Sequence, residues 1–217
     1  MGSIARSAAN NITTSGVFTS NAITNSSVTG ITVLANASDG ITFISSQTAS
    51  NSASLSFTSG LTSTYKAYKF VFSNIHPTST AVTLSFNMST DSGSNYNVTK
   101  TSTMFVAYHR EADTEDGISY DTSRDLAQST GFQPLGATIW TTNSDDSISG
   151  TLTLFNPSST TYVKHWISNV NTCQVDPASN NNYSAGYGNT TSAVNAISFQ
   201  FTSGNIADGK IYLYGIK

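Results

Sequence analysis

Three histidines are the first side chains in this sequence that could do chemistry. His76 precedes a proline, His109 opens an acidic segment, and His165 lies beside Trp166. Histidine carries protons near neutral pH and is a common metal ligand, but neither His-x-His nor Glu-x-x-His spacing occurs here. We therefore expect structural histidines. Metal ligation by His109 and His165 stays an alternative, should folding bring them together.

Residues 109–130 collect acidic side chains in a chain that is otherwise poor in charge. Calcium prefers carboxylate and carbonyl oxygens, and a pair of carboxylates can cleave a glycosidic bond. Residues 113–117, Asp-Thr-Glu-Asp-Gly, lack the Asp-x-Asp-x-Asp-Gly spacing of an EF-hand. We interpret the segment as a solvated loop, with a cation site or catalysis as alternatives. Its acidic residues are Glu111, Asp113, Glu115, Asp116, Asp121 and Asp125.

No other motif supports catalysis, and we expect no cofactor. Cys173 is the lone cysteine, which excludes an internal disulfide, and we expect a small buried or half-buried thiol and not a nucleophile. Neither a Gly-rich phosphate loop nor a Gly-x-Ser-x-Gly elbow occurs. Aromatic side chains can stack on sugar rings. The candidate receptor-facing residues, on loops expected over 109–130 and 172–190, are His109, Glu111, Asp113, Asp116, Tyr183 and Tyr187.

Strands must position these side chains, because apolar and polar residues alternate between turn clusters from residue 41 onwards. Tyr68, Phe70 and Phe72 share one face of an expected strand. This pattern predicts an all-β, antiparallel β-sandwich, a jelly roll, over residues 41–217. Residues 109–130 and 171–189 are expected to be long loops, with a short helical piece near 123–128. The expected strands are 41–45, 54–58, 65–75, 82–88, 96–108, 148–155, 162–170, 193–201 and 210–216.

Residues 1–40 have a different composition, with no charged residue between Arg6 and Asp39. Such a segment cannot bury enough apolar surface to offset the entropy of ordering it. We therefore expect an extended docking arm that a partner holds in place. The apolar residues expected to make this contact are Ile12, Val17, Phe18, Ile23 and Val28.

The overall composition narrows the class of partner. Ser, Thr and Asn make up 88 of the 217 residues, and 10% are charged, against about a quarter in an average protein. The net charge of −3 and the absence of a basic stripe argue against a nucleic-acid partner. No apolar run approaches the roughly 18 residues that span a membrane. Since no signal peptide is visible, we expect synthesis and folding in a cytosol.

Four runs of the sequence carry a family resemblance over roughly residues 40–217. They are LSFNMSTDSGSNYNVTKTSTMFVAYH, DLAQSTGFQPLG, GTLTLFNPSSTTYVKHW and AGYGNTTSAVNAISFQFTSGNIADGKIYLYGIK. Together they resemble small virion proteins of tailed bacteriophages, especially marine ones. The resemblance implies a structural or adhesive role in a virion assembled in the host's bacterial cytoplasm, and a homotrimer. It carries over no catalytic residue.

Three hypotheses about function follow. The leading one is a non-enzymatic virion subunit, a tail fibre, spike or capsid decoration, whose arm binds other virion proteins. The second is an adhesin domain that binds a host surface glycan. The third, a glycan depolymerase, needs two carboxylates about 5–10 Å apart in a groove.

Overall fold

The described part of the chain consists of strands and the turns between them. A computed structural model describes residues 40–139, 145–174 and 178–217. The expected arm residues Ile12, Val17, Phe18, Ile23 and Val28 lie outside these ranges. The strands are β1 (Ile41–Thr48), β2 (Leu55–Phe57), β3 (Ala67–Pro77), β4 (Leu84–Ser89), β5 (Lys100–Arg110), β6 (Asp116–Tyr120), β7 (Gln133–Pro134), β8 (Ile148–Phe155), β9 (Lys164–Gln174), β10 (Ala178–Gly188), β11 (Ala196–Phe201) and β12 (Ile206–Ile216).

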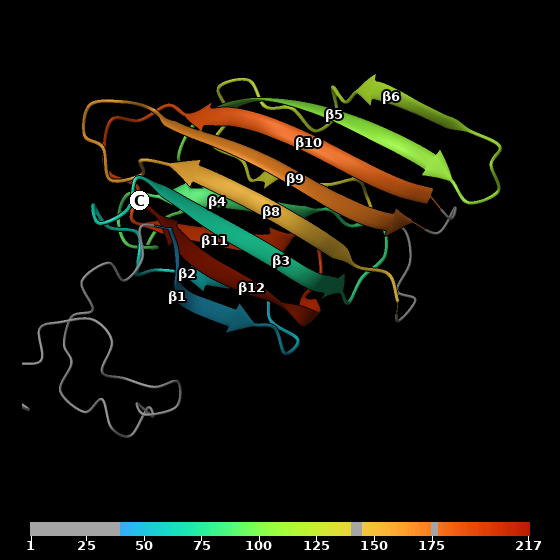
Figure 1. Cartoon of the computed structure of the whole chain (residues 1–217), viewed down its shortest axis with the longest axis horizontal. Helices are drawn as coiled ribbons and strands as arrows, with labels where there is room; N and C mark the ends of the chain where they lie inside the picture. Colours follow the sequence, from blue (N-terminus) through green and yellow to red (C-terminus); the bar gives the residue numbers. More distant parts are fainter. Residues whose placement is uncertain (1–39, 140–144, 175–177) are drawn as a thin grey trace, which may run out of the picture. The chain divides into compact units, whose positions relative to one another are not determined.

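These strands form two antiparallel sheets, drawn as two layers in Figure 1. The larger has the order β1-β12-β3-β8-β9-β10-β5-β6, and the smaller has the order β2-β11-β4-β7. Eight of the strands pair from the outside of the sequence inwards, as β1–β12, β2–β11, β3–β8 and β4–β7. This pairing places successive strands in alternate sheets and is the topology of a jelly roll. The expected antiparallel β-sandwich is therefore confirmed.

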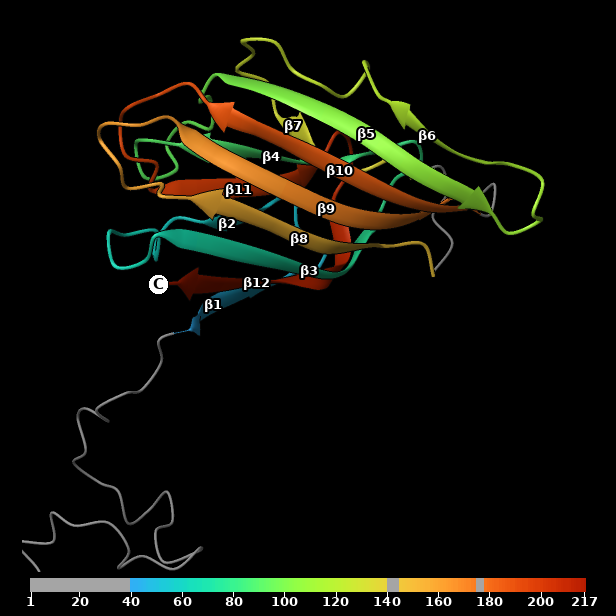
Figure 2. The same ribbon diagram turned by 45° about the horizontal axis from the view of Figure 1, so that its top comes forward.

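The remaining four strands widen the larger sheet. Strands β5 and β6 lie in the sequence between β4 and β7, and β9 and β10 lie between β8 and β11. They add the sequence β9-β10-β5-β6 to the edge of β8. Figure 2 shows the result as a broad sheet with β1 at one edge and β6 at the other. We call these four strands the extension.

Aromatic side chains from both sheets meet around Phe199 of β11. The ring of Phe199 lies 5.2–6.3 Å from the rings of Phe57, Phe70, Phe72 and Phe86, measured between centroids. These rings come from strands β2, β3 and β4. All five side chains are buried, so the cluster joins the two sheets of the jelly roll.

The inward face of the extension is different, because it is buried but largely polar. Lys100 of β5 and Lys164 of β9 both lie beside Gly188 of β10 in the sheet, and both are fully buried. The ammonium group of Lys100 donates to Asn87 Oδ1 at 2.6 Å and to the carbonyl of Val98 at 2.7 Å. That of Lys164 donates to the carbonyls of Tyr162 and Thr190. Burial lowers the pKa of both lysines, and that of Lys100 falls from 10.5 to about 7.

Two expectations about local structure were wrong. Residues 171–189 are not a loop, since they contain the end of β9 and all of β10. Residues 109–130 include the edge strand β6 and no helix. In β10 the buried positions carry Asn and Ser, so the apolar alternation that marks a strand is missing. In β6 only five residues pair, and most are exposed.

Replacing Phe199 with alanine should cost about 3–5 kcal/mol of unfolding free energy, because a cavity would replace a ring packed on four others. Urea denaturation of the full chain measures this. The exposed Ile118 of β6 provides the control, since Ile118→Ala should change the unfolding free energy by no more than about 0.5 kcal/mol. Equal effects of the two substitutions would contradict the central position of Phe199.

The stability of the protein should rise with pH between about pH 7 and 10.5 because of Lys100. In this window the unfolded chain binds a proton that the folded chain does not. We expect Lys100→Met to remove about 3 kcal/mol of this rise, measured by urea denaturation across the window. The exposed Lys66 supplies the matched control, Lys66→Met. If unfolding free energy rose as steeply with pH in Lys100→Met as in the wild type, the assignment of this rise to Lys100 would be refuted.

Candidate functional site

Strand β10 places its aromatic side chains on the outward face of the larger sheet. Asn180, Asn182 and Ser184 point inwards and are buried. Tyr183 and Tyr187 alternate with them and therefore point outwards. This is the reverse of the usual arrangement, in which the apolar side of a half-buried strand faces the core. The outward face of the extension is thus the place where exposed apolar surface needs an explanation.

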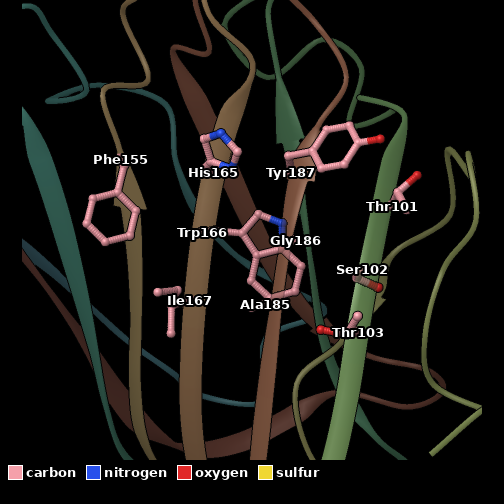
Figure 3. A pocket seen from close by; sticks show the side chains of 10 residues that line it. All are labelled: Thr101, Ser102, Thr103, Phe155, His165, Trp166, Ile167, Ala185, Gly186 and Tyr187. Carbon is pink, nitrogen blue, oxygen red and sulfur yellow. The ribbon is translucent and has the colours of Figure 1, made fainter.

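Small residues in the middle of β10 leave a hollow in this face. Ala185 lies between Ile167 of β9 and Thr103 of β5 in the sheet register. The hollow has a volume of about 480 Å³. Figure 3 shows Phe155 and Ile167 on one side of it, and Thr101 and Thr103 on the other.

Gly186 lies beneath the hollow, at an inward position of β10 that has no room for a side chain. A Cβ atom at this position would clash with the carbonyl oxygen of Thr101 and would lie 2.9 Å from Cζ2 of Trp166. Trp166 points inwards beneath the sheet, where its ring meets Phe86 edge-on at 5.0 Å. The buried indole therefore requires a glycine beside it, and the neighbouring Ala185 contributes one methyl group to the outward face.

Aromatic pairs border the hollow along the strands. The rings of Phe105 and Tyr183 stack at 4.9 Å, at an angle of 13°, and those of His165 and Tyr187 lie 6.2 Å apart. A second hollow of about 170 Å³ beside Phe105 shares Thr103, Ile167 and Ala185 with the first. We call this continuous surface the outer strip and define it by Phe105, Phe155, His165, Ile167, Tyr183 and Tyr187.

The chemistry of the outer strip favours an apolar or aromatic ligand group. Phe105, Phe155 and Ile167 are 43%, 39% and 56% exposed. The residues that line the larger hollow include no Asp, Glu, Lys or Arg. The hydroxyl groups at its rim belong to Thr101, Thr103 and Tyr187. The surface can therefore bury apolar groups of a partner and form a few hydrogen bonds at its border.

The structure brings together only part of the expected receptor-facing set. Tyr183 and Tyr187 lie in the outer strip, although on a strand and not on a loop. His109 and Asp116 are register partners on β5 and β6. His109 also neighbours Ser179 of β10, four residues before Tyr183, so it lies on the same face but further along the sheet.

Charged side chains of the acidic segment interact mainly with one another. His109 Nε2 lies 3.1 Å from Asp113 Oδ1, and Arg110 Nε donates to Glu115 Oε2 at 2.6 Å. The hydrogen bond and the charge of Arg110 lower the pKa of Glu115. The described residues contain no group of three potential metal ligands. Glu111 lines a separate hollow of about 250 Å³ with His109 and Cys173.

Cys173 lies on β9 and is exposed, so the expectation of a buried or half-buried thiol was wrong. Its register partner is Ser179, which in turn neighbours His109. Partial burial and the carboxylates of Asp146, Glu111 and Asp145 raise the pKa of the thiol. A raised pKa keeps the sulfur protonated at neutral pH, which disfavours it as a nucleophile.

Four residues of the site were not expected from the sequence, namely Phe105, Phe155, Ile167 and Ala185. A signal for Ile167 was present, because it is out of phase with the buried Trp166 and Val170 of the same strand. An apolar residue on the outward phase of a strand indicates an exposed apolar position. Ala185 gave no such signal, since its role depends on the neighbours that the sheet places beside it.

A matched pair of substitutions tests how closely β5 and Trp166 pack around Gly186, beneath the hollow. Gly186→Ala should lower the unfolding free energy by about 1–3 kcal/mol, because its Cβ would collide with the backbone of β5 and with Trp166. The side chain at position 185 points outwards, so Ala185→Ser should change the unfolding free energy by no more than about 0.5 kcal/mol. Thermal or urea unfolding of the full chain measures both. A tolerated Gly186→Ala would show that the strands are spaced differently.

Comparison of the chain with protein-family models, curated proteins and solved structures gives no significant match. Within the described residues, no helix has the length and apolar character needed to cross a membrane. The function must therefore be argued from the fold and the outer strip.

Proposed function

We propose that this protein is a non-enzymatic structural subunit of a bacteriophage particle, a fibre, spike or capsid decoration. Other virion proteins would hold it through residues 1–40 and through the outer strip. The jelly-roll sandwich supplies a rigid support for such contacts. The choice of a bacteriophage particle rests on the sequence resemblance to small virion proteins.

The observation that carries the proposal is the outward direction of the aromatic residues on β10. Tyr183 and Tyr187 face outwards, whereas the inward positions of the same strand hold the polar residues Asn182 and Ser184. Exposed apolar surface next to a hollow is typical of a binding surface for another molecule. Because charge is nearly absent from this surface, specificity must come from its shape and from hydrogen bonds at its rim.

A host-glycan adhesin is the second candidate, and the same strip supports it in part. Tyr187 and Phe155 are aromatic, and the hydroxyl groups of Thr101 and Thr103 lie across the hollow from Phe155. Sugar binding uses aromatic stacking together with many hydrogen bonds. The mostly apolar lining fits an apolar protein side chain better. A glycan array probed with the purified chain tests whether the strip binds sugars. No binding at millimolar sugar would exclude the adhesin.

Particle incorporation tests the leading proposal. The tagged full chain, supplied to a host in which the phage assembles, should co-sediment with the particles. A chain without residues 2–30 should stay soluble and fail to join them. If the truncated chain is incorporated at full occupancy, the docking role of the arm is wrong. If the full chain never co-sediments, the proposed function is wrong.

The outer strip can be tested separately with Ile167→Lys. A charged side chain in the apolar strip should weaken binding to the particle partner at least about tenfold, which corresponds to 1.4 kcal/mol. Ile118→Lys on β6 is the control, because Ile118 is 76% exposed and lies outside the strip. Circular dichroism verifies that both variants fold. Equal incorporation of the two variants would exclude the strip as the contact surface.

A further inference from the structure

The two sheets have four edge strands among the described residues, and three of them are protected from pairing. Strand β7 has two residues and contains Pro134, and β2 has three residues. Strand β6 starts at Asp116 and is flanked by Glu115 and Asp121. Short length, proline and charge are the devices by which proteins keep a sheet edge from accepting another strand.

Strand β1 is the exception. It is eight residues long and contains neither a charged residue nor a proline. The chain from Gly40 to Tyr65 carries no charge at all. A register shift between Phe43 and Ser45 against β12 bends the strand, and among the described residues this is its one protective feature. In Figures 1 and 2, β1 is the outermost strand of the larger sheet.

The side chains of β1 also match a buried position better than an exposed one. Ile41 and Phe43 are 61% and 56% exposed. The ring of Phe43 meets that of Tyr214 on β12 edge-on at 5.7 Å. A further strand beside β1 would cover the free side of Phe43 and would satisfy the outward N–H and C=O groups of the strand.

We propose that β1 pairs with β1 of a second copy of this chain, antiparallel and across a two-fold axis near Phe43, so that the Phe43 side chains of the two copies lie opposite each other. The pair would join two eight-stranded sheets into one sheet of sixteen strands. Like strands can meet here because β1 has no charge to repel its own copy, whereas at β6 the carboxylates of Asp116 in two copies would approach each other. This inference does not depend on the phage proposal, since it concerns a different edge and purified protein alone.

The test is the mass of the purified full chain in sedimentation velocity over a series of concentrations. We expect a monomer–dimer equilibrium. The double variant Ile41→Lys, Phe43→Lys should weaken dimerisation at least tenfold, because four lysines would gather at the junction. The matched control is Ile118→Lys, Tyr120→Lys on β6, which should leave the equilibrium unchanged.

Charge complementation distinguishes pairing of β1 with itself from every other contact. A second double variant, Ile41→Glu, Phe43→Glu, should also be monomeric. A mixture of the lysine and glutamate variants should dimerise again, because each strand then meets the opposite charge. Circular dichroism establishes that each variant is folded before mixing.

Three results would overturn the proposal. The wild-type chain could be monomeric at every concentration. Its oligomer could have an odd number of chains, such as the trimer that the family resemblance implies. The lysine and glutamate variants could each assemble like the wild type, or fail to assemble together when mixed.

Discussion

The packing of Phe199 against four other phenylalanines is the interaction on which the rest of the structure depends. It joins the small sheet to the jelly-roll half of the large one and anchors β3, the strand beside β8. The extension begins beside β8, with β9, and has no such aromatic cluster of its own within the described residues. It is held by its strand ladders, by Trp166 against Phe86, and by inward polar groups bonded to backbone, such as Ser168 Oγ on the carbonyl of Thr151.

This difference in support explains why the extension has its polar and apolar faces exchanged. Inward positions of β10 carry polar side chains instead of a core. Asn182 Nδ2 donates to the carbonyl of Asn180, whereas Asn182 Oδ1 and Ser184 Oγ are buried with no hydrogen-bond partner among the described residues. The aromatic residues of the same strand are then on the outward face. A sheet with this arrangement costs stability when it is alone, because exposed aromatic surface gains nothing from water. The partner proposed for that face would recover the loss, and binding and stability would then be coupled there.

The small number of charged residues also affects how the protein would assemble with other molecules. An uncharged surface rich in Ser, Thr and Asn neither repels nor attracts at long range, so contacts form through shape and short hydrogen bonds. The outer strip and the β1 edge lie on different parts of the larger sheet, with β12 and β3 between β1 and β8. The two proposed contacts, with a second copy at the β1 edge and with a different molecule on the face of the extension, therefore use different residues.

Alternation along the sequence was enough to predict an all-β sandwich, because Tyr68, Phe70 and Phe72 report a buried face wherever the strand is placed. The sequence could not predict β10, since its inward Asn and Ser residues look like those of a loop. It also could not reveal the hollow. That depends on register, which sets Ala185 between Ile167 and Thr103. Composition and local pattern determined the fold class, whereas pairing between distant strands decided which residues form a surface.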